Sequence, residues 1–467
     1  MILDQIARSA IDRLIDGQHD QLNLPGVALA VTNGEQLLYV REYGFADVAA
    51  ARPVGADTLF EIGSISKSFT AALVVQDALA GKLDLHAPVT DYLPWFSVQA
   101  QHDQPITVHH LLQHSAGIVT GSEATSEARS EVWALRHTEA VAEPGTWFHY
   151  SNVGYKTLGV LLERLHALSY GELVQSRILD RLGLKHTAPL ITNEVRARLA
   201  VGYEAAYDDR QLEPGGVLAP ATWLTTGTAD GSIVSTAADM AAYLRAWIRP
   251  GAAFSPELVQ AVTGNSLPSD LPMPGARYGY GWDLYTLDGH RHIAHGGGMV
   301  GYRAQVIANL DAELGVVILT NGPGDPEPLA LEVLATARAS LNGGGGRDAE
   351  VCINLTRQEP GSEAVQASGQ SDLKRDEPEW LTGHWRSHNP WLSNFRTRWQ
   401  DGQLVMLAPI GVESPGAEMV LVPLGGHHYR VGLDERSPER LSYSMFIEGV
   451  PHEVSFSGCP YHRTFTD

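Results

Sequence analysis

A serine and a lysine three residues apart stand directly before a long apolar segment of this chain. Ser64 and Lys67 lie within residues 60–70, and the apolar run 71–75 follows them. If a helix begins here, the hydroxyl and the amine share one helical face, one turn apart. A buried lysine that gives up its proton can turn an ordinary serine into a nucleophile. The segment therefore predicts a helix whose first turn carries a reactive serine.

The same spacing occurs again at Ser371 and Lys374, where it has a simpler explanation. That pair lies in a polar stretch with no apolar helix behind it. A solvated linker accounts for it completely. Spacing alone is thus a weak signal, and the interpretation of Ser64 as a reactive serine depends on further motifs.

A tyrosine and an asparagine two residues apart form the second motif. Tyr150 and Asn152 follow the turn at residues 143–145, and an extended or loop backbone would point both side chains the same way. A phenol, with a reference pKa of about 10, is a poor base unless a nearby cation favours the phenolate. Lys67 is the candidate for that cation.

A histidine followed by three glycines forms the third motif, ahead of an alternating run at residues 303–308. The motif begins at His295 and includes Gly297 and Gly298. Glycines beside a strand let a substrate backbone approach closely and leave N–H groups free to bind an oxyanion. The pattern predicts an oxyanion site beside a strand.

In this order, the three motifs resemble those of the serine β-lactamase and penicillin-recognising hydrolase superfamily. The nearest branch contains class C β-lactamases, D-aminopeptidases, D,D-carboxypeptidases and related esterases. Residues 106–117 and 231–240 also resemble segments of that family, and the resemblance covers roughly residues 1–342. The matched residues are Ser64 and Lys67 in the first motif, Tyr150 and Asn152 in the Tyr-x-Asn motif, and His295 and Gly297 in the third.

The resemblance implies acyl transfer through a covalent intermediate on Ser64. Lys67 and Tyr150 would share the task of taking the serine proton, and Tyr150 would later protonate the leaving group and activate water. The oxyanion would lie between the N–H groups of Ser64 and Gly298. Asn152 would orient Lys67 and the substrate amide. We expect no cofactor and no metal.

His295 departs from the family pattern, because true β-lactamases carry Lys-Thr-Gly at this motif. It would position Tyr150 or the polar end of the substrate, but an imidazole holds a carboxylate less firmly than lysine does. The expected function is therefore a serine peptidase or amidase acting on small peptides or amides, with D-configured substrates among the candidates. A broad carboxylesterase with weak β-lactamase activity and a non-catalytic binding protein are the alternatives.

Charge and composition exclude several classes of partner. The formal net charge of −21 disfavours nucleic acids and anionic membranes, and no apolar run approaches the ~18 residues of a membrane span. Residues 1–20 read as an amphipathic helix without a signal-peptide pattern, so a cytoplasmic location is expected. A small-molecule or short-peptide substrate is the expected partner. The sequence leaves open whether the chain forms a homo-oligomer. His109, His110 and His114 lack ligands at metal-binding spacing.

The order of elements predicts an α/β fold with two domains. Residues 1–342 are expected to form a β-lactamase-like antiparallel sheet whose first and last strands pair, flanked by helices and a helical subdomain. Residues 343–378 read as a linker. Short alternating runs in residues 379–467 predict a small antiparallel, lipocalin-like β-barrel. The two cysteines, Cys352 and Cys459, exclude a disulfide framework and leave a single bridge open.

Overall fold

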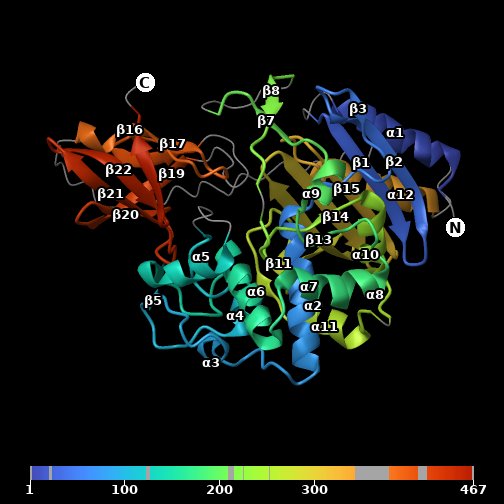
Figure 1. Cartoon of the computed structure of the whole chain (residues 1–467), viewed down its shortest axis with the longest axis horizontal. Helices are drawn as coiled ribbons and strands as arrows, with labels where there is room; N and C mark the ends of the chain where they lie inside the picture. The colour runs from blue at the N-terminus through green and yellow to red at the C-terminus, as the bar shows by residue number, and fades with distance from the viewer. Residues whose placement is uncertain are drawn as a thin grey trace.

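The computed structural model describes residues 3–19, 24–121, 127–208, 215–224, 226–251, 253–341, 378–408 and 418–464. Figure 1 shows a large part, in which helices pack around a sheet, and a separate β-barrel formed by the C-terminal residues. The α/β fold class and the antiparallel barrel predicted from the sequence are confirmed. The predicted linker 343–378 lies, except for its last residue, outside the described residues, as do Ser371, Lys374 and Cys352.

A nine-stranded antiparallel sheet forms the centre of the large part. The first strand of the chain pairs with the last strand of the sheet in sequence, from Val27 opposite Thr320 to Asn33 opposite Leu314. This confirms the predicted pairing of strands from the two ends. In spatial order the strands are β10 (Leu267–Pro268), β11 (Arg277–Tyr278), β12 (Asp283–Leu287), β13 (His290–Met299), β14 (Tyr302–Asn309), β15 (Leu314–Thr320), β1 (Gly26–Asn33), β2 (Leu37–Asp47) and β3 (Arg52–Pro53).

Helices cover both faces of this sheet. On one face α1 (Gln5–His19) packs against α12 (Glu327–Leu341), and on the other α10 (Ala237–Ile248) contacts β1 and β15. Because both faces are covered, β1 and β15 are apolar along nearly their whole length instead of alternating. The remaining α-helices are α2 (Ser66–Leu79), α3 (Val89–Tyr92), α4 (Val108–Leu112), α5 (Ala128–Ala134), α6 (Asn152–His166), α7 (Tyr170–Val174), α8 (Asp180–Leu182), α9 (Asn193–Arg198) and α11 (Pro256–Gly264).

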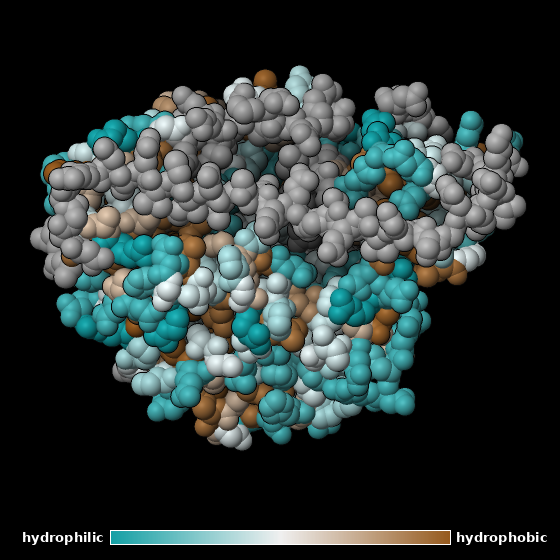
Figure 2. Space-filling view, turned by 180° about the vertical axis from the view of Figure 1, so that it is seen from behind, coloured by the Kyte–Doolittle hydropathy of each residue, from teal (hydrophilic) through white to brown (hydrophobic). Residues whose placement is uncertain are grey.

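The surface of the molecule mixes polar and apolar residues. Figure 2 shows hydrophilic and apolar residues interleaved over the described part of one face. A small exposed apolar group lies at the end of a barrel hairpin, at Met445, Phe446 and Ile447. No described helix is both long enough and apolar enough to span a lipid bilayer.

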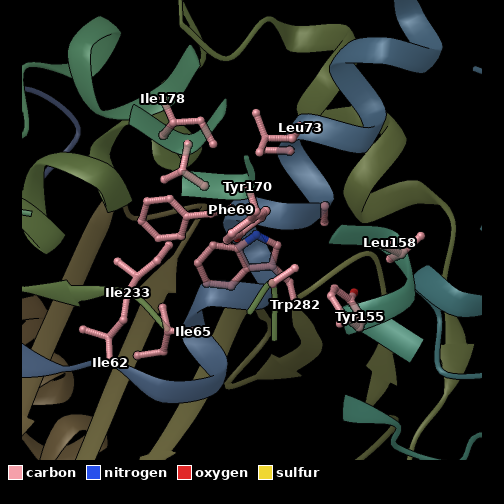
Figure 3. Close-up of a cluster of buried hydrophobic side chains, with 14 of the residues drawn as sticks. Ile62, Ile65, Phe69, Leu73, Tyr155, Leu158, Tyr170, Ile178, Ile233 and Trp282 are labelled. Atoms are coloured by element: carbon pink, nitrogen blue, oxygen red, sulfur yellow. The ribbon is translucent and has the colours of Figure 1, made fainter. Parts of the chain in front are cut away.

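Helix α2 runs through the middle of the largest hydrophobic core. Figure 3 shows Phe69 and Leu73 of α2 surrounded by apolar side chains from several helices and from the segments before and after it. The Phe69 ring stacks on Tyr243, with ring centroids 3.8 Å apart. Because neighbours enclose α2 on all sides, its polar side chains are buried as well, and they tie the helix to its surroundings.

The C-terminal barrel closes on itself and has its own core. Its first and last strands pair, with Trp385 opposite Arg463. Trp385 is fully buried and its indole N–H donates to Thr397 Oγ1 at 2.9 Å. The strands are β16 (Gly383–Arg386), β17 (Asn394–Gln400), β18 (Gln403–Leu407), β19 (Glu418–Gly425), β20 (His428–Val431), β21 (Arg440–Ile447), β22 (Val450–Phe456) and β23 (Cys459–Arg463).

Side-chain hydrogen bonds set two element boundaries near the site. Strand β2 begins at Leu37, because the Asn33 side chain accepts the N–H groups of residues 35 and 36 and extends the turn. Helix α6 begins at Asn152, because Ser151 Oγ accepts the N–H of Gly154.

Candidate active site

The expected nucleophile and its lysine lie at the start of the buried helix. Ser64 belongs to the short 3₁₀ helix η1 (Gly63–Ile65), which leads into α2, and it is partly exposed. Lys67 is fully buried, and its Nζ donates to Ser64 Oγ at 2.9 Å and to the backbone oxygen of Asp230 at 2.9 Å. A partly exposed serine is thus hydrogen-bonded to a buried amine, and a nucleophilic serine needs such an adjacent base.

Buried hydroxyl groups hold the first turns of α2 in place. Ser66 Oγ accepts the N–H of Ile233 at 3.2 Å, and Ser68 Oγ donates to the backbone oxygen of Ile65 at 2.7 Å. Thr70 Oγ1 donates to the backbone oxygen of Ala229 at 2.6 Å. The bonds of Ser66 and Thr70 fix the helix against the segment 229–233, which also supplies the carbonyl that binds Lys67.

Tyr150 and Asn152 lie on either side of the residue that caps α6. Ser151 has an extended backbone, and Asn152 is the first, buried residue of the helix. The Nζ of Lys67 lies 4.9 Å from the centroid of the Tyr150 ring, so the second motif meets the first. At this distance the electron-rich face of the Tyr150 ring attracts an ammonium group on Lys67.

The glycine motif brings β13 into direct contact with η1. A Cβ atom on Gly297 would lie 1.9 Å from the backbone oxygen of Ile62, and one on Gly63 would lie 2.7 Å from the backbone N of Gly298. Only glycine permits such an approach. The Gly298 N–H is therefore carried beside the segment of Ser64, where an oxyanion would form.

The strand that pairs with the outer edge of β13 ends before the segment beside the nucleophile. Strand β12 starts at Asp283, opposite Ala294, so its pairing with β13 ends just before His295. On the inner side β13 continues to pair with β14 as far as Met299. In the part of the chain that the structure describes, no strand pairs with the outer edge of residues 295–299. An extended substrate could bind there by adding a strand.

His295 is buried and bound by the protein at both ring nitrogens. Its Nδ1 lies 2.6 Å from the backbone oxygen of Gly296, and its Nε2 lies 3.0 Å from the hydroxyl of Tyr278. Burial, with a contribution from the charge of Lys67, lowers the pKa of His295 to about 4. The ring is therefore neutral at pH 7, with the proton on Nδ1, and it accepts the Tyr278 hydroxyl hydrogen.

The ring of Tyr278 connects His295 to the expected base. Tyr278 meets the Tyr150 ring edge-on, with centroids 6.4 Å apart. His295 therefore reaches Tyr150 only indirectly, because His295 bonds to Tyr278 and Tyr278 packs on Tyr150. Its expected role in positioning Tyr150 or the polar end of the substrate stays a prediction. Sequence reasoning missed Tyr278, because it lies in a two-residue strand outside all three motifs.

His114 is a second residue whose place in the site was missed. Its Nδ1 accepts the N–H of Ser151 at 2.9 Å, and its ring lies 4.2 Å from the Tyr150 ring, centroid to centroid. Burial, followed by the charges of Lys67, His295 and His149, lowers its pKa well below the usual value. The signal for it was present in residues 106–117, which resemble a family segment.

The neighbouring histidines have structural partners. His109 Nδ1 lies 2.6 Å from the Tyr280 hydroxyl, and His110 takes part in the cap of α4 through Thr107. Burial lowers the pKa of both His109 and His110 to about 4. Within the described ranges, no group of three or more His, Cys, Asp or Glu side chains is arranged to hold a metal ion.

A buried ion-pair cluster supports the carbonyl that binds Lys67. Lys156 of α6 lies 2.6 Å from Glu131 and 3.8 Å from the Asp230 carboxylate. The cluster links α5 and α6 to residue 230 behind the lysine of the site. Its three members are far apart in the sequence, so no local pattern indicated that they meet.

Comparison with known proteins gives a family match and two groups of curated relatives. Residues 11–340 match the family described as Beta-lactamase. Protein flp of Staphylococcus aureus strain MW2 is 24% identical over 71% of this chain and 66% of its own length, so the chain spans slightly less than two thirds of that relative. A β-lactamase of Pseudomonas fluorescens is 27% identical over 60% of this chain and 74% of its own length.

Solved structures share the fold. The octameric penicillin-binding protein homologue from Pyrococcus abyssi superposes with a TM-score of 0.64 at 22% identity, and the match covers 96% of this chain and 98% of that one. A D-stereospecific amidohydrolase from Streptomyces sp. gives a TM-score of 0.60 at 21% identity, covering 70% and 98% of the two chains. At such identities the likeness shows the fold alone.

Proposed function

Because this chain belongs to the Beta-lactamase family of serine hydrolases, we propose that it cleaves small peptides or amides through an acyl-enzyme on Ser64. The observation that carries the proposal is the 2.9 Å hydrogen bond between Lys67 Nζ and Ser64 Oγ at the partly exposed start of α2. Tyr150 lies beside Lys67, and Gly297 and Gly298, which follow His295 in the third motif, pack on the turn that carries Ser64. Asn152 begins α6 two residues after Tyr150.

The proposed acylation begins when Ser64 Oγ attacks the carbonyl carbon of the substrate. The hydroxyl proton passes to Lys67 or Tyr150, whichever is deprotonated, and the carbonyl oxygen becomes an oxyanion facing the N–H groups of Ser64 and Gly298. As the C–N bond breaks, the same proton moves to the departing nitrogen. In deacylation a water gives a proton to Tyr150 or Lys67, attacks the ester, and Ser64 recovers its hydrogen.

The state of His295 supports a substrate without a carboxylate at this position. A ring that is neutral at pH 7 and engaged at both nitrogens offers no fixed positive charge. β-Lactams and D,D-carboxypeptidase substrates carry a free carboxylate, so they are disfavoured relative to amides and peptides. The name of the structurally similar D-stereospecific amidohydrolase accords with this substrate class.

Covalent labelling tests the nucleophile. A fluorophosphonate probe should modify the parent protein at Ser64, as identified by mass spectrometry of peptides, and Ser64→Ala should abolish the labelling while the protein stays folded. Ser371→Ala provides the matched control, since it removes the serine of the second S-x-x-K and should label like the parent. Labelling of Ser64→Ala, or a modification mapped to Ser371, would contradict the proposal.

A substrate panel tests the finer assignment. We expect D- or L-aminoacyl p-nitroanilides to give higher kcat/KM values than a chromogenic cephalosporin. p-Nitrophenyl esters distinguish the alternative of a broad carboxylesterase. Turnover of esters without any anilide hydrolysis would favour that alternative, and efficient cephalosporin hydrolysis would show that His295 does not exclude carboxylates.

A further inference from the structure

A glutamate of the C-terminal barrel is bound to the segments that carry Tyr150. Glu439 precedes β21, and its side chain is only 12% exposed. Its Oε1 accepts the backbone N–H of Thr120 at 2.8 Å and lies 3.0 Å from Nε2 of His149. Its Oε2 accepts the hydroxyl of Ser457, within the barrel. One carboxylate thus joins the barrel to two segments of the large part.

The two partners of Glu439 in the large part, Thr120 and His149, are both linked directly to Tyr150. His149 precedes it in the chain, and Thr120 Oγ1 donates to the Tyr150 backbone oxygen at 3.1 Å. The backbone oxygen of Thr120 also accepts the N–H of Val153 at 3.1 Å, in the first turn of α6. Residues 119–120 and 149–153 therefore form one hydrogen-bonded unit, called here the Tyr150 cradle, and Glu439 binds it at two points.

The charge on Glu439 suits this contact. Burial raises its pKa, but the hydrogen bond and charge of His149, together with bonds from Ser457 and Thr120, outweigh burial and leave the pKa below its usual value. Glu439 is therefore a carboxylate at pH 7, which binds N–H donors more strongly than a neutral acceptor does.

Aromatic packing continues the contact beyond the carboxylate. The Trp147 ring stacks on His149, with centroids 5.0 Å apart and 18° between planes, and the Arg436 guanidinium of the barrel lies 5.0 Å from the Trp147 ring centroid. Beside them Arg440 binds Glu139 at 2.7 Å. The barrel loop before β21 thus covers the turn that leads into the Tyr150 cradle.

We propose that Glu439 is a positioning residue for Tyr150, so that the barrel completes the active site of the large part. The inference rests on the proposed function, in which Tyr150 exchanges a proton with Ser64. Tyr150 lies in a connection before α6 and not within a helix or strand, so its backbone is held by individual hydrogen bonds from neighbouring segments, including that of Thr120 Oγ1. Displacing a reacting group by about 1 Å can cost roughly 10²-fold in rate.

A second contact between the barrel and the large part supplies the control. Asp208 binds Arg386 at 2.9 Å and accepts the hydroxyl of Ser393 at 2.9 Å, and its backbone oxygen accepts from Asn394. Asp208→Ala weakens the docking of the barrel without removing any bond to the Tyr150 cradle. Glu439→Gln is the conservative variant, because its amide oxygen can still accept from Thr120 and His149 while its NH₂ faces Ser457.

The test compares these full-length variants by the rate of fluorophosphonate labelling and by hydrogen exchange. We expect Glu439→Ala to label about 10- to 10²-fold more slowly and to exchange faster in peptides covering 117–121 and 147–153. Glu439→Gln should stay within a few-fold of the parent in both measurements, and Asp208→Ala should match the parent. If Glu439→Ala does not fold, His149→Ala takes its place, with slower labelling and faster exchange expected.

Distinct results separate this inference from the proposed function. Parental labelling and exchange in Glu439→Ala would overturn the inference and leave the role of Ser64 intact. An equal loss of rate in Asp208→Ala would also overturn it, because any disturbance of the barrel would then suffice. If the parent itself is not labelled, the proposed function fails, and the exchange rates alone decide whether Glu439 holds the Tyr150 cradle.

Discussion

At the scale of single residues, the site depends on what encloses Lys67. Its ammonium group meets a hydroxyl, a backbone carbonyl and the face of a phenol ring, and it has no exposed surface. The Asp230 backbone oxygen accepts from Lys67 Nζ at 2.9 Å, and the Asp230 carboxylate lies 3.8 Å from Lys156 Nζ, so one residue contacts both lysines.

Removing either expected base should slow catalysis strongly. We expect Lys67→Ala and Tyr150→Phe each to lower kcat by at least ~10²-fold, because general acid–base help typically contributes 10²- to 10⁴-fold. The measurement is kcat on the best substrate of the panel. Tyr155→Phe is the control and should keep a near-parental kcat. It also removes a tyrosine hydroxyl, but that hydroxyl donates to the Leu112 backbone oxygen at 2.7 Å and is not an expected base. Near-parental kcat in Tyr150→Phe would make Tyr150 structural and leave Lys67 to act alone.

Exchanging His295 for lysine should change the preferred substrate. His295→Lys introduces a group with a reference pKa of about 10.4 in place of a ring that is neutral at pH 7. We expect the ratio of kcat/KM for a cephalosporin to kcat/KM for a p-nitroanilide to rise, because discrimination is differential transition-state binding. His295→Gln controls for loss of the ring without added charge. An unchanged ratio in stable His295→Lys protein would remove the main support for the amide preference.

At the scale of elements, the contact between β13 and η1 positions the oxyanion site. The strand continues for five residues beyond the end of β12 pairing, and its glycines let it approach the turn that carries the nucleophile. The buried helix α2 continues that turn and is anchored through its hydroxyl groups. Strand and helix belong to different layers, so their contact sets the distance between Ser64 and Gly298.

A methyl group on Gly297 should separate these two elements. In Gly297→Ala the Cβ would lie 1.9 Å from the Ile62 backbone oxygen, so β13 or η1 must move. We expect a loss of about 10²-fold in kcat and a destabilisation of about 1–3 kcal/mol, read from kinetics and denaturant unfolding. Gly296→Ala is the control, because its Cβ would meet only the end of the flexible Gln305 side chain, at 3.2 Å. Similar losses in both variants would argue against a specific role for Gly297.

At the scale of the whole molecule, buried ionisable groups make the free energy of unfolding depend on pH. Burial raises the pKa of Glu61 and of Asp283 to about 8. Between about pH 4.5 and 8 the folded state therefore binds more protons than the unfolded state, and stability falls as pH rises through this window. His109, His110 and His295, with pKa values lowered to about 4, act in the opposite direction below about pH 6.5.

Neutralising Glu61 should flatten the alkaline side of the stability profile. Glu61→Gln should raise the melting temperature relative to the parent at pH 8 more than at pH 5, since the glutamine avoids burial of a carboxylate charge. Thermal unfolding across pH 5–8 measures the difference. The exposed Asp57→Asn serves as the control and should follow the parent profile. A melting-temperature difference independent of pH would show that Glu61 does not titrate with a raised pKa.

Three motifs in the sequence were enough to predict the family, the antiparallel sheet of the large part and the candidate residues of the site, and the short alternating runs of residues 379–467 predicted the barrel. Each motif is local: Ser64 and Lys67 share one helical turn, Tyr150 and Asn152 flank a cap, and the glycines of β13 are consecutive. Local spacing and periodic burial leave a trace in the order of residues, because they depend on backbone geometry that repeats along the chain.

Only the tertiary structure decided which distant residues meet these motifs. The carbonyl of Asp230, the rings of His114 and Tyr278 and the carboxylate of Glu439 come from four separate segments, and no spacing in the sequence links them. The charge state of His295 was undecided for the same reason, since it depends on burial and on partners contributed by other strands. Contacts of high sequence separation arise from packing, so their positions are determined when the layers and the barrel come together.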